Sequence, residues 1–274
     1  MRALVALIRA THPLPALAVT TLVAVVTAAR DADASALAFV VASTATGQAS
    51  VGWSNDYLDR DRDAIAGRTD KPIVAGEIGP FVVWVAALVA FPFSIVLSLL
   101  VGAAEALVML VAVASAWAYN FGLKGTVFSG IPYVVAFGLA PVYIWLATSD
   151  SLPAGWIVAA GALLGAAAHL LNALPDFESD RRGEVRGLVH RLGFRRALLL
   201  ACAVLAVLLG VILLADGVPA TGRQLGAGAV AAILILAVAW AGLRGAARLG
   251  FRLTILAAGA LVATFVLSPA AARL

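Results

Sequence analysis

A cluster of carboxylates lies in the segment Asn-Asp-Tyr-Leu-Asp-Arg-Asp-Arg-Asp, which begins at Asn55. Asp56, Asp59 and Asp63 are three and four residues apart, a spacing that places all three side chains on one face of a helix. Like charges at this spacing repel one another, so we expect positive charge among them. Carboxylate oxygens are typical ligands of Mg2+, which proteins often share with substrate phosphates. The segment therefore predicts a magnesium site with these three aspartates as its ligands.

A second acidic segment, Asn-Ala-Leu-Pro-Asp-Phe-Glu-Ser-Asp, runs from Asn172 to Asp180. When the first segment is shifted by 117 residues, its first asparagine coincides with Asn172, its second aspartate with Asp176 and its last with Asp180. Of the four motif residues in the first segment, only Asp56 loses its counterpart, because it coincides with Ala173. Internal repeats in membrane proteins often place a binding site at the interface of the two halves. We therefore expect Asp176 and Asp180 to hold a second Mg2+ opposite the first.

The composition of the chain indicates an integral membrane protein. Of its 274 residues, 63% are hydrophobic and 12% are charged, whereas soluble proteins have about 45–50% and about 25%. The net charge is +4. Multi-pass membrane proteins carry an excess of basic residues in their cytoplasmic loops, and this excess explains the charge. We therefore expect no nucleic-acid partner. The single cysteine, Cys202, excludes a disulfide within the chain.

Apolar runs long enough to cross a bilayer predict an all-α bundle of about nine transmembrane helices around a central cavity. A membrane-spanning helix needs about 20 mostly apolar residues. Segments of this kind occur at residues 13–29, 35–54, 80–99, 101–120, 128–147, 154–174, 196–215, 222–242 and 252–269. We expect one domain over 1–274, with pseudo-repeats at roughly 13–120 and 128–242 and an extra C-terminal helix at 252–269.

The distribution of basic residues predicts the orientation of this bundle. With the N-terminus in the cytoplasm, all of the 19 lysines and arginines except Arg30, Arg223 and Arg273 lie on the cytoplasmic side. Such an asymmetry is what the positive-inside rule requires. The pattern predicts a bacterial-type plasma membrane protein whose two acidic segments both face the cytoplasm. No cleavable signal peptide is expected, because the first apolar run lacks a small-residue cleavage site.

The two acidic segments resemble the motifs of the UbiA family of intramembrane prenyltransferases, Asn-Asp-x-x-Asp-x-x-x-Asp and Asp-x-x-x-Asp. The first motif is complete and the second is present at Asp176 and Asp180. Lys71-Pro72 is similar to a basic residue and proline downstream of the family's first motif, and Tyr119 to Lys124 resembles its Tyr…Lys loop. The resemblance covers nearly the whole chain. It implies a Mg2+ site in the cytoplasmic cap and a central cavity that opens to lipid.

This resemblance implies transfer of an isoprenyl group from a polyprenyl diphosphate to a hydrophobic acceptor, either an aromatic ring or a lipid precursor. Mg2+ would act as a Lewis acid on the departing oxygens, and basic side chains would stabilise the charge that develops there. The residues expected to contact the diphosphate are Arg68, Lys71, Lys124 and Arg186, with hydrogen-bonding support from Asn55, Tyr119, Asn120 and Asn172.

Two departures from the family's patterns concern the acceptor. Members of the menaquinone, chlorophyll and archaeal-lipid types often repeat the full first motif at the second site, and Ala173 breaks that pattern. Enzymes that use 4-hydroxybenzoate often have a Tyr-Asp pair upstream of the second motif, and the segment from His169 to Asn172 does not contain it. The acceptor therefore stays open between aromatic and lipid-precursor classes.

Two other functions are compatible with the same residues. A terpene cyclase on this scaffold would use the same Mg2+ sites and need no separate acceptor. An ion-coupled transporter would also combine acidic pairs, an internal repeat and about nine spans. Against a transporter, the carboxylates lie at helix ends and not near the middle of the bilayer.

Overall fold

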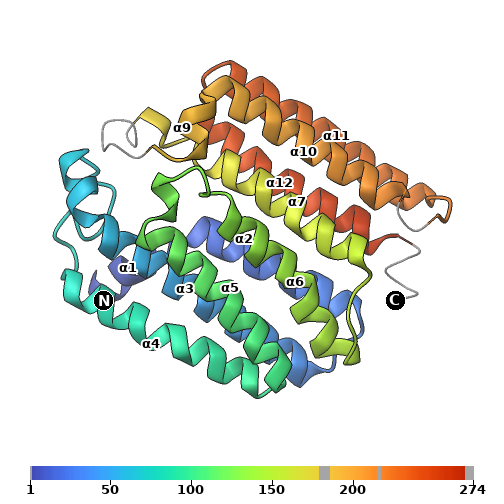
Figure 1. Cartoon of the computed structure of the whole chain (residues 1–274), viewed down its shortest axis with the longest axis horizontal. Helices are drawn as coiled ribbons and strands as arrows, with labels where there is room; N and C mark the ends of the chain where they lie inside the picture. Colours follow the sequence, from blue (N-terminus) through green and yellow to red (C-terminus); the bar gives the residue numbers. More distant parts are fainter. Residues whose placement is uncertain (1, 179–185, 215–216, 269–274) are drawn as a thin grey trace.

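The computed structural model describes residues 2–178, 186–214 and 217–268, and within these ranges all regular secondary structure is helical (Figure 1). The long helices are α2 (Pro13–Ala29), α3 (Ala34–Ile65), α4 (Pro80–Leu99), α5 (Ala103–Phe121), α6 (Ile131–Ser149), α7 (Gly155–Asn172), α10 (Phe194–Leu214), α11 (Gly222–Leu243) and α12 (Ala247–Val266). The short ones are α1 (Arg2–Arg9), α9 (Leu188–Leu192) and the 3-10 turn η1 (Leu123–Gly125).

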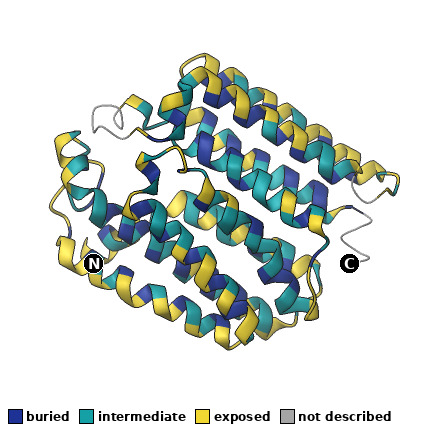
Figure 2. Cartoon of the chain, in the orientation of Figure 1, coloured by how far each residue is buried: buried dark blue, intermediate teal, exposed yellow. Residues whose placement is uncertain are grey.

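The predicted all-α membrane bundle is confirmed. Among the residues described, eight helices are long and apolar enough to cross a bilayer, and the bent pair α1 and α2 would make a ninth span. Large apolar side chains such as Leu88, Val89 and Phe93 are exposed on the outside of the bundle, where Figure 2 shows mostly exposed and half-buried positions. An outer surface of this kind suits hydrocarbon and not water, so the chain is a multi-pass integral membrane protein.

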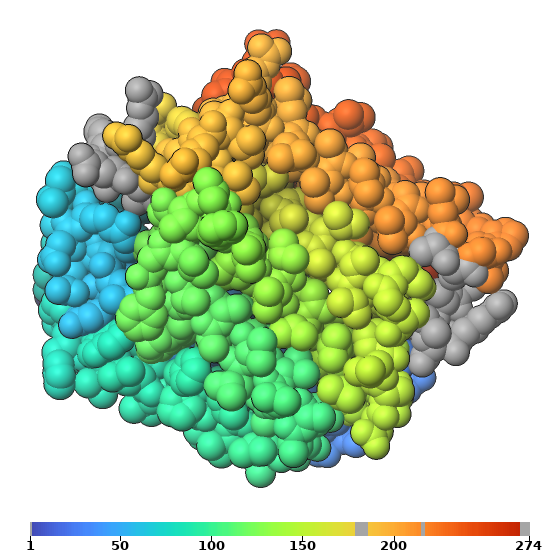
Figure 3. Space-filling view, viewed as in Figure 1, coloured from blue at the N-terminus to red at the C-terminus, as the bar shows by residue number. Residues whose placement is uncertain are grey.

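The helices close into a ring. Each long helix packs against the next one along the chain, from α2 to α7 and from α7 through α10 and α11 to α12, and α12 packs back against α2. Figure 3 shows one continuous face of this ring, in which α4, α5 and α6 lie below α10. A closed ring of helices leaves its centre for the cavities described below.

Helix α3 is longer than the predicted segment 35–54, because the first acidic segment continues the helix. Asp33 caps its N-terminus by accepting hydrogen bonds of 2.8 Å from the backbone of Ser35 and Ala36. The helix ends before Gly67, whose φ of 70° favours glycine. At 32 residues it is roughly 48 Å long, well beyond the hydrocarbon thickness of about 30 Å. Its last turns, with the three aspartates, therefore extend beyond the apolar layer.

The break between α1 and α2 lies against the middle of α3. The two helices meet at 66°, and His12 at the break has a φ of 55°. Trp53 donates a hydrogen bond of 2.8 Å to the carbonyl of Leu7, and Arg9 donates one of 2.5 Å to Glu77. The short first helix is thereby fixed over the side of α3 that carries the carboxylates.

Replacing Gly52 by Ala should destabilise this arrangement. A Cβ atom at Gly52 would lie 2.4 Å from the backbone oxygen of Thr11, and a backbone atom cannot rotate away. We expect the free energy of unfolding to fall by about 1–3 kcal/mol, as for other overpacked sites, measured by thermal unfolding in detergent. The matched control is Gly226→Ala in α11, where a Cβ would meet nothing within 4 Å. Equal melting temperatures for both variants would contradict this account.

Candidate active site

Most of the predicted site residues line one cavity of about 350 Å³, at the end of the helix ring where the two acidic segments lie. Ten of the thirteen are on its wall: Asn55, Asp59, Asp63, Arg68, Lys71, Tyr119, Asn120, Lys124, Asn172 and Asp176. Asp56 is buried but does not line the cavity. Arg186 is exposed, away from the cavity wall, and Asp180 lies outside the described residues. The structure thus brings residues of both acidic segments and of the loop after α5 to one place.

Asp56 is the most deeply buried of the three carboxylates on α3, with 1% of its side chain exposed. Lys71 Nζ donates a hydrogen bond of 2.5 Å to its Oδ1. His12 Nε2 lies 2.9 Å from the same oxygen and 3.0 Å from Lys71 Nζ. The other oxygen, Oδ2, is buried and has no hydrogen-bond partner among the described residues. Asp56 therefore binds Lys71 and His12 through one oxygen, whereas its second oxygen is buried without a partner among the described residues.

Asp59 lines the cavity and forms ion pairs with two basic side chains. Arg62, one turn further along α3, pairs with its Oδ1. Lys124, on η1, pairs with the same oxygen and is itself almost completely buried. Asn55 donates a hydrogen bond of 3.0 Å to Oδ2. The first acidic segment and the loop after α5 meet at this carboxylate.

Arg68 joins the two acidic segments. Its Nη1 lies 3.8 Å from Asp63 Oδ1 and 3.2 Å from Asp176 Oδ2, and its Nη2 lies 3.5 Å from Asp70 Oδ2. Burial would lower the pKa of Arg68, but the carboxylates around it outweigh that effect and raise the pKa above the ordinary value. Arg68 is therefore a permanent cation between the two motifs, and its contact with a phosphate stays a prediction.

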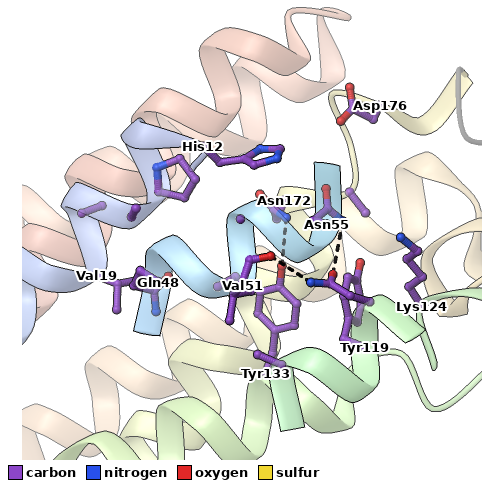
Figure 4. A pocket seen from close by; sticks show the side chains of 18 of the residues that line it. His12, Val19, Gln48, Val51, Asn55, Tyr119, Lys124, Tyr133, Asn172 and Asp176 are labelled. Carbon is purple, nitrogen blue, oxygen red and sulfur yellow. Dashed lines mark hydrogen bonds between the residues drawn. The ribbon is translucent and has the colours of Figure 1, made fainter. Parts of the chain in front are cut away.

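Asparagine and tyrosine side chains form the wall next to these charges. Asn55 donates to Asn120 at 3.2 Å, and Asn120 donates to the backbone of Val51 at 2.9 Å. Asn172 donates to the hydroxyl of Tyr133 at 2.9 Å (Figure 4). Because their hydrogen bonds cross between helices, these amides fix α5 to α3 and α7 to α6 beside the cavity.

Sequence reasoning missed two residues on this wall, His12 and Tyr133. His12 lies 44 residues before Asp56, and only the break between α1 and α2 brings them together. Tyr133 lies in the otherwise apolar first half of α6, so its partner on α7 cannot be inferred from spacing. For Tyr133 one signal existed, since a tyrosine hydroxyl in an apolar helix usually needs a polar partner.

The carboxylates do not form a ready-made metal site in the described part of the chain, where no three His, Cys, Asp or Glu residues lie close enough to hold an ion. Each predicted ligand described is instead paired with a lysine, arginine or histidine. The donor set nevertheless suits a hard cation, since it consists of carboxylate and amide oxygens. The buried, unpaired Oδ2 of Asp56 adds one such oxygen.

A second cavity, of about 200 Å³, adjoins the first and lies between the helices of the bundle. The two share part of their walls, namely Val19, Leu22, Gln48, Val51, Ala116, Ala136, Phe137 and Leu164. The wall of the second cavity carries no charged side chain among the residues described. The combined space is therefore charged at one end and apolar at the other.

The sequence matches the model of the UbiA prenyltransferase family over residues 16–249. It is 29% identical over 157 residues to a digeranylgeranylglyceryl phosphate synthase of Archaeoglobus fulgidus, covering 55% of this chain and 52% of the relative. It is 30% identical over 171 residues to the bacteriochlorophyll synthase 33 kDa chain of Rhodobacter capsulatus, covering 56% and 54%. The matched part thus spans about half the length of these relatives.

Solved structures of similar proteins have the same fold. A UbiA homologue from Archaeoglobus fulgidus bound to GPP and Mg2+ superposes with a TM-score of 0.72 at 18% identity, covering 94% of this chain and 99% of that one. The apo structure of a UbiA homologue from Aeropyrum pernix K1 gives a TM-score of 0.73 at 17% identity, covering 92% and 96%. At this level of identity the likeness concerns the arrangement of helices alone.

Proposed function

Because this chain belongs to the UbiA prenyltransferase family, we propose that it transfers a prenyl group from a polyprenyl diphosphate to a hydrophobic acceptor. One observation carries the proposal: the two motifs meet at the charged end of a cavity whose other end is apolar. A polyprenyl diphosphate has the same division into a charged head and a hydrocarbon tail.

Mg2+ is the proposed cofactor. Asp56, Asp59 and Asp63 would hold one ion, and Asp176 with Asp180 a second. In favour of Asp56 is its unpaired buried oxygen; in favour of Asp59, Asp63 and Asp176 is their position on the cavity wall. When bound, Mg2+ supplies Lewis-acid stabilisation of the leaving diphosphate.

The basic residues of the chain would stabilise the same leaving group. Lys71, Lys124 and Arg68 line the cavity within reach of the carboxylates. Preorganised cations are most effective where negative charge develops during the reaction. Asn55, Asn120, Asn172 and Tyr119 would support them by hydrogen bonding, and Arg186 would have to approach from outside the cavity.

The apolar cavity would protect the other half of the reaction. Departure of diphosphate leaves positive charge on the allylic carbon, which water would quench. The wall between the charged end and the bundle centre consists mainly of Val, Leu, Ala and Phe side chains, and exclusion of water from such a site prevents hydrolysis of reactive intermediates. The allylic carbon would then bond to the nucleophilic atom of an acceptor bound beside it, and the proton that this atom loses would leave with the diphosphate or pass to water.

The acceptor is proposed to be an aromatic or lipid-precursor molecule that enters from the membrane. The relatives are named for the synthesis of digeranylgeranylglyceryl phosphate and of bacteriochlorophyll, so acceptors of both classes belong in the first test. We place the site on the cytoplasmic side of a bacterial-type plasma membrane, as the basic residues of the sequence indicate.

The proposal is tested by diphosphate release from protein in nanodiscs with Mg2+ and geranyl, farnesyl or geranylgeranyl diphosphate. Quinone precursors and lipid phosphates are added as acceptors, and products are identified by mass spectrometry. We expect release that depends on an acceptor and yields its prenylated form. Chelation of Mg2+ should lower the rate at least about 100-fold, because a Lewis acid contributes several kcal/mol, and added Mg2+ should restore it.

Other outcomes of the same assay identify the alternatives. A hydrocarbon or terpene alcohol formed without acceptor would show a cyclase. If no donor released diphosphate and the protein catalysed ion-driven flux in liposomes, the results would support a transporter instead of a transferase.

A further inference from the structure

The apolar cavity ends against an indole ring. Its wall includes Trp145 on α6, Ile157 on α7 and Phe265 on α12. All three lie within about one turn of the helix ends that are remote from the carboxylates. Trp145 is 1% exposed, and its ring centroid lies 6.3 Å from that of Phe265. The large flat ring therefore forms part of the cavity wall at the end remote from the carboxylates.

Arg30 fixes this ring from outside. Its guanidinium carbon lies 3.7 Å from the centre of the Trp145 ring, a geometry that attracts the cation to the aromatic face. Arg30 Nε donates to the hydroxyl of Thr148 at 2.9 Å, and Nη2 donates to that of Ser149 at 3.1 Å. With Arg30 held by the last turn of α6, the indole cannot easily swing away from the cavity.

Next to the indole, the cavity wall exposes few polar groups to a hydrocarbon chain. Tyr143 lines the cavity, but its hydroxyl is 2.7 Å from Ser43 Oγ and 2.9 Å from Ser98 Oγ. Both of these serines are fully buried, so the tyrosine presents its ring to the space. The cavity also adjoins the charged one, with which it shares part of its wall, so a tail anchored by its diphosphate would extend toward it.

The depth of the space follows from the helices that line it. From Tyr133 beside the charged end to Trp145 there are twelve residues of α6, or roughly 18 Å. An isoprene unit contributes four carbon–carbon bonds, or about 5 Å when extended. The space between these two aromatic residues therefore accommodates between three and four extended units.

We propose that Trp145, held by Arg30, is the floor that limits the donor to three or four isoprene units. This inference rests on the proposed function, since it assigns the apolar cavity to the donor's tail. Removal of the indole would extend the space, and a large side chain placed higher on the wall would shorten it.

The test compares donors of two, three, four and six isoprene units with the wild type and two variants. We expect the wild type to use three or four units at least about 10-fold more efficiently than six, a ratio that hydrophobic pockets commonly achieve. Trp145→Ala should remove this difference. Ala112→Phe on α5, which lines the same cavity nearer its charged end, should shift the preference to two units.

The matched control is Trp156→Ala. Trp156 also contacts Phe265, with ring centroids 5.9 Å apart, but it does not line the cavity. We expect its length preference to equal that of the wild type. If Trp145→Ala does not fold, Trp145→Leu and Ala112→Phe test the same floor from two directions.

Binding is measured separately from turnover, by displacement of a fluorescent prenyl diphosphate with thiolodiphosphate analogues of each length. If the wild type used and bound donors of all lengths equally, and Trp145→Ala did the same, Trp145 would not limit donor length. The tail would then leave the cavity sideways into lipid, and the proposed transfer reaction would be unaffected. Failure of the wild type to bind or use any donor would overturn the proposed function as well.

Discussion

We expect replacement of Asp59 by Asn to lower turnover by about 10³-fold or more. The loss of one preorganised electrostatic contact typically costs about 10²–10³-fold in rate, and Asp59 makes several such contacts. Arg62, Lys124 and Asn55 all bind this carboxylate. The substitution keeps the size of the side chain and removes its charge. It would weaken the proposed Mg2+ site and remove the ion pair between Lys124 and this carboxylate at the same time.

The measurements are diphosphate release under saturating Mg2+ and donor, and direct binding of Mn2+ followed by electron paramagnetic resonance. Asp61→Asn is the matched control, because Asp61 lies on the same helix with 81% of its side chain exposed and pairs only loosely with Arg60, at 3.4 Å. We expect this control to retain wild-type turnover. Full activity and unchanged Mn2+ binding in Asp59→Asn would remove Asp59 from the proposed site.

The second large effect concerns Lys71. Its replacement by Met would leave Asp56 buried with His12 as the only side chain described at its charged oxygen. Breaking a buried ion pair by removing one partner typically costs about 3–5 kcal/mol of folding free energy. We therefore expect a strongly lowered melting temperature in detergent, together with loss of turnover because the proposed diphosphate contact is gone.

A double variant separates these two consequences. Asp56→Asn in the Lys71→Met background removes the unpaired buried charge, so most of the stability should return while turnover stays lost. Arg60→Met serves as the control for removal of a cation, because its pairing with exposed Asp61 is of the kind worth about 0–1 kcal/mol. A double variant no more stable than Lys71→Met would show that the pair does not determine stability.

The helices were predictable because the bilayer leaves few choices. A backbone that crosses hydrocarbon must satisfy its own hydrogen bonds, so an apolar run of about 20 residues can hardly be anything but a helix. The predicted segments 80–99 and 222–242 agree with α4 and α11 almost to the residue. The first acidic segment was also predictable, since its spacing of three and four residues is a property of one helix.

What the sequence could not provide were contacts between distant segments. Asp56, Asp59 and Asp63 are equivalent in the motif, yet the structure buries Asp56 behind the cavity wall and exposes the others to it. That difference depends on Lys71 and His12, which reach Asp56 only after a loop and a bent helix pair have packed. Spacing along one chain segment carries no information about such packing.

The two acidic segments also differ more in structure than their sequences suggest. Asp59 lies inside α3, whereas Asp176 lies in a turn after the end of α7 at Asn172. Pro175 accounts for this, because proline lacks the backbone N–H that helix continuation requires and restricts the residue before it. The division into pseudo-repeats at 13–120 and 128–242 stays a prediction.

The length of α3 has a consequence for what happens after the reaction. Because α3 is longer than the thickness of the hydrocarbon layer, its carboxylates reach the aqueous boundary while its middle stays within the hydrocarbon. In the proposed transfer, diphosphate would be released where water can take it up, and the prenylated acceptor where lipid can. The two products would partition into different phases as they form, and their separation would oppose the reverse reaction without any moving part.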